Sequence, residues 1–272
     1  MRGVYVMRRF LLTFLLAFLA MSPTPVVHSQ EPAEVDLALV LAVDISYSMD
    51  MDELALQRSG YVEAFRSKQV HDAIEKGAVG RIAVAYFEWA GQNVIHNTMD
   101  WVILDTAADA NAFADRLAEA PIRRGRRTSI SGAIDNSMEL LAKAPVRPLR
   151  RVIDISGDGP NNDGRLVNVA RDEALDKGIG INGLPIMLKS PGYLDIGALD
   201  QYYEDCVIGG VGAFVVPVRE RHQFADAVRT KLVREIALAP DDAARLIQKA
   251  QARTSRTNCA IGERLMRDRF GN

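Results

Sequence analysis

The chain has 272 residues, of which 48% are hydrophobic and 25% charged, the composition of an ordinary globular protein that can bury a sizeable core. Lysine and arginine total 33, and aspartate and glutamate total 35, a balance that argues against a general nucleic-acid-binding protein. One main domain is the simplest interpretation.

The first 29 residues have the pattern of a secretory signal peptide. Three arginines precede the apolar run Phe10–Met21, and residues 27–29 offer small side chains for cleavage. The run is shorter than the ~20 apolar residues that cross a bilayer, with an uncleaved anchor as the alternative. Its removal leaves a net charge of about −5. We expect a periplasmic or secreted protein whose mature chain starts with a linker at 30–34 and does not span a membrane.

Five apolar runs have the pattern of strands buried on both faces of a parallel sheet. In chain order they are residues 35–43, 81–89, 151–155, 181–188 and 213–218. Amphipathic, helix-length segments lie between them. Their apolar faces are formed by Leu54, Tyr61, Val62 and Phe65, by Ile130, Ile134, Met138 and Leu141, and by Phe224, Val228, Leu232 and Ile236. Residues 93–104 follow Ala90-Gly91 and predict a hairpin edge strand.

This alternation predicts an α/β fold: a doubly wound, mostly parallel open sheet with helices on both faces and one antiparallel edge strand. We assign it to residues 35–238 and assign a helical C-terminal extension and tail to 239–272. Export to an oxidising compartment would allow a disulfide between Cys206 and Cys259, and two unpaired thiols are an equal alternative. In such sheets, ligands bind outside the carboxyl ends of the strands, so the loops that follow strands are the candidate site.

Oxygen-bearing side chains occur in three of these loops. Asp44, Ser46 and Ser48 alternate after the first strand, Thr128 opens a segment that starts a helix, and Asp158 follows the strand 151–155. A hard cation such as Mg²⁺ takes oxygen ligands near ~2.1 Å, and alternate residues of a turning loop can converge at that distance. For the two serines alone, capping of the following helix is the alternative.

Together these loops resemble the metal-ion-dependent adhesion site (MIDAS) of von Willebrand factor A (VWA) domains, over roughly residues 35–238. The resemblance implies that the hydroxyls of Ser46 and Ser48 ligate a metal and that Thr128 does so directly or through water. Asp44 and Asp158 would ligate it or accept hydrogen bonds from metal-bound water. We expect Mg²⁺, with Mn²⁺ or Ca²⁺ as alternatives.

The charge of this ligand set indicates a function. Two carboxylates and three neutral hydroxyls leave a divalent ion short of anionic donors, so an open position would favour an aspartate or glutamate from a partner protein. A basic loop formed by Arg123, Arg124, Arg126 and Arg127 precedes Thr128 and would steer an acidic partner, with a merely solvated loop as the alternative. Tyr47, Arg124, Arg126 and Arg127 are the candidate partner contacts, whereas Trp89 is expected to be buried.

Four stretches are also similar to an uncharacterised family of exported bacterial VWA-like proteins (DUF1194-like). They are residues 87–91, 155–162, 181–186 and 202–210. The chain departs from VWA domains at Gly157, where these domains usually have threonine or serine. That residue is not usually a primary ligand in VWA domains, so metal binding is still expected.

An enzyme is the main rival class. Asp44 after a strand resembles the nucleophile of haloacid-dehalogenase-like phosphatases, but Ser46 stands where those enzymes need a second acid. The four histidines show no zinc-ligand spacing, and the sequence has no Walker A loop. We therefore expect a monomeric, non-enzymatic domain that uses a divalent cation to bind a carboxylate of a partner. There are two alternatives to this function: a metal-independent interaction module with a vestigial metal site, and a metal-dependent hydrolase.

Overall fold

A computed structural model describes residues 31–192, 196–237 and 257–271. The chain divides into two units, residues 1–31 and 32–272, and the second is described below. The predicted signal peptide and the part of the predicted C-terminal extension from 239 to 256 lie outside the described residues.

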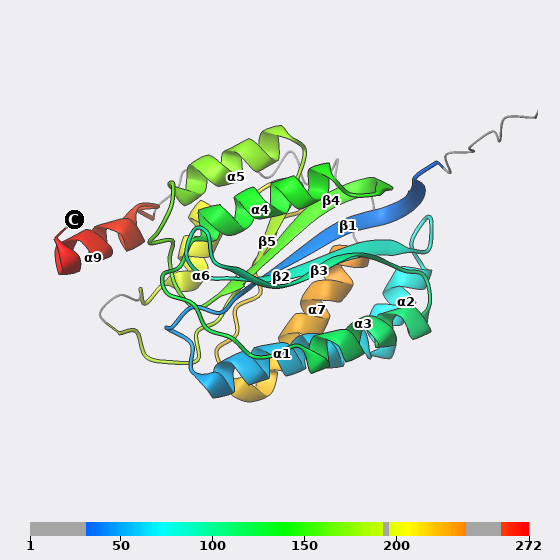
Figure 1. Ribbon diagram of the computed structural model, residues 1–272, viewed down its shortest axis with the longest axis horizontal. Helices are drawn as coiled ribbons and strands as arrows, with labels where there is room; N and C mark the ends of the chain where they lie inside the picture. The colour runs from blue at the N-terminus through cyan, green and yellow to red at the C-terminus, as the bar shows by residue number, and fades with distance from the viewer. Residues whose placement is uncertain (1–30, 193–195, 238–256, 272) are drawn as a thin grey trace, which may run out of the picture. The chain divides into compact units, whose positions relative to one another are not determined.

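Five strands form one sheet in the order β3-β2-β1-β4-β5 (Figure 1). They are β1 (Ala33–Asp44), β2 (Ile82–Trp89), β3 (Ile95–Leu104), β4 (Val146–Gly157) and β5 (Gly180–Pro185). The pairs β1/β2, β1/β4 and β4/β5 are parallel, whereas β2/β3 is antiparallel. Every residue of β1 from Val35 to Asp44 is buried, as expected for a central strand that is covered on both faces.

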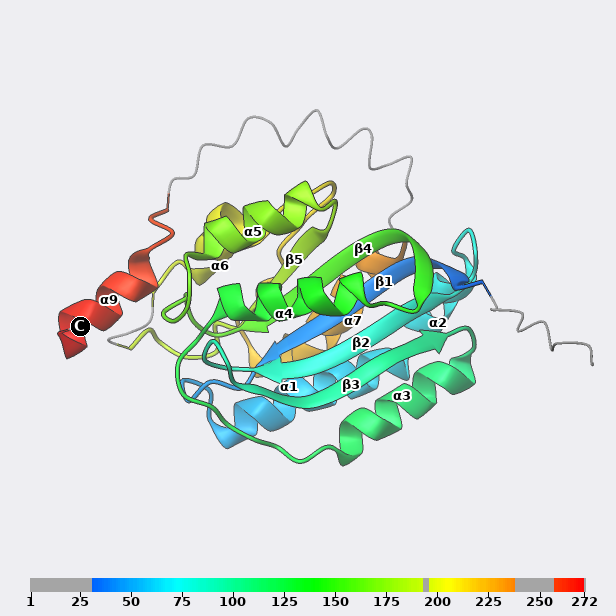
Figure 2. The same cartoon turned by 45° about the horizontal axis from the view of Figure 1, so that its top comes forward.

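Helices cover both faces of the sheet (Figures 1 and 2). One face packs against α1 (Met51–Phe65), α2 (Lys68–Glu75), α3 (Ala107–Glu119) and α7 (Phe224–Ala237). The other packs against α4 (Ile130–Ala142), α5 (Val167–Asp176), α6 (Leu199–Tyr202) and the π-helical turn η1 (Tyr203–Val207). A short 3-10 helix, η2 (Arg221–Gln223), precedes α7, and α9 (Ile261–Phe270) ends the described chain.

Side chains of β1 alternate between two cores. Leu37, Leu39 and Leu41 belong to the core beneath α1 and α7, whereas Ala38 and Val40 belong to the core beneath α4 and α5. The predicted α/β fold, with its mostly parallel sheet and antiparallel edge strand, is confirmed. None of the helices in the described ranges is long and apolar enough to cross a membrane.

The predicted strand at residues 213–218 is wrong as a continuous strand. Val215 and Val218 make only isolated parallel bridges to Gly183 and Ile186. The amides of Gly183 and Met187 donate to the carbonyls of Phe214 and Val218, but the intervening donor position is Pro185, which has no N–H. The missing hydrogen bond interrupts the ladder between β5 and residues 213–218. β5 ends at Pro185, short of the predicted residue 188, because Pro185 is the last residue that pairs with β4.

Candidate metal centre

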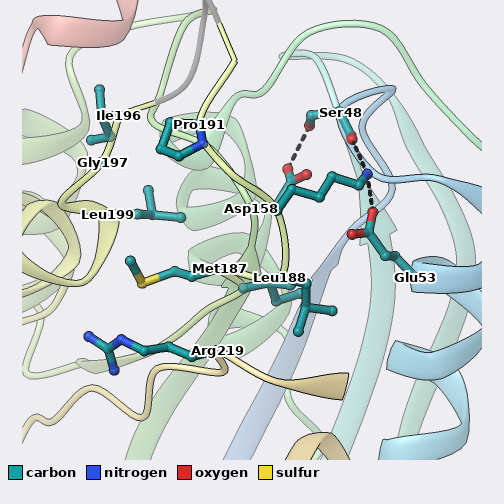
Figure 3. Close-up of a pocket in the computed structure, with 12 residues that line it drawn as sticks. Ser48, Glu53, Asp158, Met187, Leu188, Pro191, Ile196, Gly197, Leu199 and Arg219 are labelled. Atoms are coloured by element: carbon teal, nitrogen blue, oxygen red, sulfur yellow. Dashed lines mark hydrogen bonds and ion pairs between the residues drawn. The ribbon is translucent and has the colours of Figure 1, made fainter. Parts of the chain in front are cut away.

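A chain of polar contacts links the loop after β1 to the loop after β4. The Oδ1 atom of Asp44, a fully buried residue, accepts a hydrogen bond of 2.7 Å from the backbone amide of Ser46. The Oγ atoms of Ser46 and Ser48 lie 2.8 Å apart. The Ser48 hydroxyl donates to Asp158 Oδ1 at 2.5 Å, a contact shown in Figure 3. The carboxyl ends of the adjacent strands β1 and β4 thus bring four of the five proposed ligands together.

Thr128 reaches the same edge through backbone pairing. The amide of Gly125 donates to the carbonyl of Ile45 at 2.8 Å, which attaches the basic loop to the end of β1. Thr128 itself is buried, and its Oγ1 lies 3.9 Å from the position that a Cβ on Gly159 would take. Ser46, Ser48 and Thr128 line one common cleft. All five proposed ligands therefore lie at one edge of the sheet.

The electrostatics of this edge are suited to a cation. Asp44 Oδ2 is buried and has no hydrogen-bond partner. Burial, and next the nearby carboxylate of Asp158, raise the pKa of Asp44 well above its usual value, although the amides of Ser46 and Asp158 lower it. A divalent ion would offset both the burial cost and the repulsion between the two carboxylates.

The donor set favours a hard cation over a zinc-type site. Two carboxylates and three hydroxyls supply only oxygen ligands, which are the ligands that Mg²⁺ and Ca²⁺ prefer. No group of three or more His, Cys, Asp or Glu side chains suited to a metal occurs within the described ranges. The residues present therefore fit a MIDAS-type ion.

Gly157, the residue that departs from the VWA pattern, lies against Asp44 and Tyr203. A Cβ at this position would lie 2.8 Å from Asp44 Oδ2 and 2.9 Å from the Tyr203 hydroxyl oxygen. Both distances are too short for an ordinary contact, so a threonine or serine here would require Asp44 or Tyr203 to shift. Tyr203, which belongs to η1, is fully buried.

Three polar residues that the sequence analysis assigned no role hold the loops in place. Gln57 of α1 donates to the Asp44 carbonyl at 2.9 Å and accepts from the Ser156 hydroxyl at 3.2 Å, which joins the ends of β1 and β4. The side-chain Oδ1 of Asn162 accepts from the backbone amide of Thr128 at 2.9 Å. The backbone amide of Asn162 donates in turn to the Thr128 carbonyl at 2.8 Å. Asn161 Oδ1 accepts from the Ser131 amide at 2.9 Å.

The proposed partner contacts are placed as follows. Tyr47 is 55% exposed. The guanidinium of Arg124 donates to the Tyr47 carbonyl at 2.6 Å and lies 4.9 Å from the centroid of the Tyr47 ring. Arg126 and Arg127 are exposed beside Thr128. Trp89 is buried, as predicted. Solvent therefore reaches the aromatic and basic side chains around the centre.

Between Ser48 and the segment that follows β5 lies a cleft of about 180 Å³, shown in Figure 3. Ser48 and Asp158 line it together with apolar residues such as Met187 and Leu188. Lys189 donates to the Ser48 carbonyl at 3.0 Å and forms an ion pair with Glu53. This contact attaches the segment after β5 to the serine loop.

Comparison with known proteins gives a family and a fold. Residues 34–240 match the family described as "Protein of unknown function (DUF1194)". No curated protein matches.

Among solved structures, proximal thread matrix protein 1 (PTMP1) from the mussel byssus, in a form "with zinc occupied MIDAS motif", is similar at 14% identity and a TM-score of 0.56, over 76% of this chain and 49% of that one. The pilus adhesin SpaC from Lactobacillus rhamnosus GG is similar at 12% identity and a TM-score of 0.53, over 78% of this chain and 30% of that one. The chain thus spans about half the length of PTMP1, and at these identities the similarity concerns the fold. The chain belongs to the DUF1194 family and has a VWA-like fold.

Proposed function

We propose that this protein is an exported, non-enzymatic binding domain in which Asp44, Ser46, Ser48, Thr128 and Asp158 hold a divalent cation, with Mg²⁺ as the first candidate. The observation that carries the proposal is the buried Asp44 Oδ2 without a hydrogen-bond partner, next to the linked side chains of Ser46, Ser48 and Asp158. A buried carboxylate oxygen without a partner is costly, and a cation would remove that cost.

The second step of the proposal is that the cation binds an aspartate or glutamate of a partner protein. Only two anionic donors surround the ion, so a third carboxylate would bind at an open coordination position. Ser48 and Tyr47 are exposed, so a partner can reach the proposed cation from their side. Positive charge around this position comes from Arg124, Arg126 and Arg127. The similar structure of PTMP1 has a zinc-occupied MIDAS motif, which supports a divalent ion on this fold.

Localisation forms part of the proposal. The N-terminal pattern favours export, and a disulfide joins Cys206 and Cys259. Disulfides persist in oxidising compartments, which supports the periplasm or the extracellular space.

Calorimetric titration of the chelator-treated protein with MgCl₂ and MnCl₂ tests the metal site. The wild type should bind one ion, and Ser46→Ala and Asp158→Ala should abolish or greatly weaken binding. Asp176→Ala, which removes an exposed carboxylate from α5, is the matched control and should bind like the wild type. Equal metal binding by all four proteins, or by none of them, contradicts the proposal.

Capture of a partner from an envelope extract tests the second step. Proteins retained by the wild type in Mg²⁺ should be released by chelator and should not be retained by Asp158→Ala. Retention that is the same in chelator and in Mg²⁺ would identify a metal-independent interaction module instead.

A further inference from the structure

A cleft of about 420 Å³ opens beside the candidate metal centre, and two distant parts of the chain form it. Ser46, Ser48 and Thr128 line it on the side of the metal centre, next to Arg127 of the basic loop. The other wall is α9, which contributes Met266, Arg269 and Phe270. We call this the C-terminal cleft.

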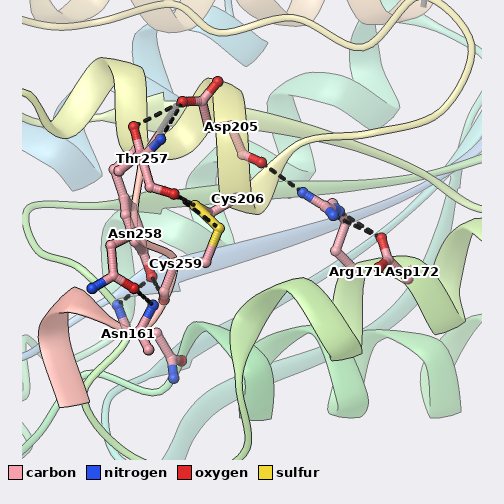
Figure 4. The surroundings of a disulfide bond; sticks show 10 residues. Asn161, Arg171, Asp172, Asp205, Cys206, Thr257, Asn258 and Cys259 are labelled. Carbon is pink, nitrogen blue, oxygen red and sulfur yellow. Dashed lines mark hydrogen bonds and ion pairs between the residues drawn. A yellow bond between two sulfur atoms is a disulfide. The ribbon is translucent and has the colours of Figure 1, made fainter. Parts of the chain in front are cut away.

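A covalent bond holds the segment before α9 to the domain. The disulfide Cys206–Cys259 joins it to η1 (Figure 4). Beside it, the amide and hydroxyl of Thr257 both donate to Asp205 Oδ2, at 3.0 and 2.8 Å (Figure 4). The start of α9 is therefore fixed to the same turn that contributes Tyr203.

Buried Asn161 connects α9 to the metal-site loops. Its Nδ2 donates to Glu263 Oε1 of α9 at 2.7 Å, while its Oδ1 accepts from the Ser131 amide of α4. A Cβ on Gly262 would collide with the Asn161 carbonyl, so the backbone of α9 packs directly on this loop. The wall formed by α9 thus has a defined position relative to Thr128 and Asp158.

The cleft is basic and partly apolar. Arg127 and Arg269 contribute its charge, and none of the residues identified as lining it is acidic. Phe270 is 55% exposed, and the Arg127 guanidinium lies 6.0 Å from its ring centroid. Positive charge beside an exposed aromatic ring is complementary to a ligand that combines negative charge with an apolar side chain.

We propose that the C-terminal cleft is the docking surface for an acidic segment of the partner protein. In this segment, the metal-bound aspartate or glutamate stands next to an apolar residue that packs on Met266 and Phe270, and further negative charge meets Arg127 and Arg269. The proposal rests on the proposed function, since the metal fixes where the carboxylate binds. Helix α9 then determines which acidic segments bind.

The probe for this proposal is a phage-displayed library of random-sequence peptides, selected on the wild-type protein in Mg²⁺. The enriched peptides should share an aspartate or glutamate next to leucine, isoleucine, phenylalanine or methionine. Fluorescence anisotropy with one labelled, enriched peptide then gives the affinity of each variant. Arg269→Ala and Phe270→Ser should each weaken binding about tenfold, the effect of removing a central contact.

Arg267→Ala is the matched control, because Arg267 is exposed on the same helix but does not line the cleft. It should leave peptide affinity unchanged, and calorimetry should show the same Mg²⁺ affinity in all three variants. Equal peptide affinity of Arg269→Ala, Phe270→Ser and the wild type overturns the proposal. Enrichment of no peptide, or of peptides without the acidic-apolar pair, overturns it too.

Two further outcomes separate this inference from the proposed function. Peptide binding that depends on Phe270 but persists in chelator supports the docking surface and refutes the metal's role. A dimer in solution that Phe270→Ser dissociates would show that a second copy fills the cleft, which overturns the assignment to a partner protein.

Discussion

Tyr203 fills the space beside Gly157: its hydroxyl oxygen lies 2.9 Å from where a Cβ on that glycine would be. Asp44 Oδ2 limits the same space from another side, at 2.8 Å. The glycine that departs from the VWA pattern is therefore matched to a tyrosine that comes from a turn far along the chain.

This relationship predicts the effect of side chains at position 157. Gly157→Ala should destabilise the protein by about 1–3 kcal/mol through overpacking. Gly159→Ala is the matched control, since its Cβ would only make an ordinary contact with Thr128 Oγ1 at 3.9 Å. Urea unfolding measures both free energies.

A double-mutant cycle isolates the contribution of Tyr203. Its buried hydroxyl has no hydrogen-bond partner, so Tyr203→Phe alone should cost little. Combined with Gly157→Ala, it should recover part of the lost stability, because one of the two close contacts disappears. Strictly additive free energies would show that the two residues do not share the space.

Asn162 should set the metal affinity without ligating the metal. Asn162→Ala removes the acceptor of the Thr128 amide, so the Thr128 loop should loosen. We expect Mg²⁺ affinity to fall about 10–100-fold, as for other residues that orient metal ligands, with the circular dichroism spectrum preserved. Asn168→Ala, at a half-buried asparagine on α5, should have no effect on calorimetric Mg²⁺ binding. Unchanged affinity in Asn162→Ala would show that the Thr128 loop needs no such support.

A buried ionic cluster away from the metal centre should make stability depend on pH. Lys231 Nζ lies 2.5 Å from Asp154 Oδ1 and also forms an ion pair with Glu235, and all three side chains are buried. One cation thus faces two carboxylates, and burial raises the pKa of Glu235 to about 7. The folded state therefore holds a proton on Glu235 more tightly than the unfolded state does. The contribution of Glu235 to the free energy of unfolding is full below about pH 4.5 and is lost as the pH rises through 7.

The comparison of wild type with Glu235→Gln measures this contribution. The free energy of unfolding of the wild type, relative to the variant, should fall by a few kcal/mol, roughly 3, between pH 4.5 and pH 7. Parallel pH profiles of the two proteins would contradict the assignment.

The cation of this cluster should matter as well. Lys231→Met should lower the free energy of unfolding by about 3–5 kcal/mol at pH 7 in urea unfolding, because both carboxylates stay buried without their cation.

The disulfide should stabilise the fold by constraining the unfolded chain. The loop between Cys206 and Cys259 is 54 residues long, which corresponds to about 4 kcal/mol on the chain-entropy estimate. The double variant Cys206→Ala/Cys259→Ala should therefore unfold at lower urea concentration than the wild type. Reducing agent should lower the stability of the wild type but not that of the double variant, and a wild type insensitive to reduction would contradict the expectation.

Most of the fold could be predicted from the sequence because parallel strands buried on both faces leave uninterrupted apolar runs. The run at 213–218 has the pattern of a strand but does not form one. Its hydrogen-bond ladder with β5 is interrupted at Pro185, a residue outside the run. In the same way, Asp44, Ser46, Ser48 and Asp158 could be placed together because they follow adjacent strands. Thr128 depended on the resemblance to VWA domains, as its position is set by the pairing of Gly125 with Ile45.

The roles of Tyr203 and α9 could not be predicted. Tyr203 acts through the space it fills beside Gly157, and no spacing in the sequence indicates that contact. The Cys206–Cys259 bond attaches the segment before α9 to the domain, and the sequence alone left the two cysteines either paired or free. Asn161 and Asn162 were part of the family resemblance, but their hydrogen bonds appear only in the structure.

The most direct test of the metal centre is a crystal structure of the protein grown in MnCl₂, with anomalous diffraction data that locate manganese. We predict one strong peak at the edge of the sheet, about 2.1–2.3 Å from the hydroxyl oxygens of Ser46 and Ser48. A peak bound elsewhere, or none at saturating manganese, would contradict it.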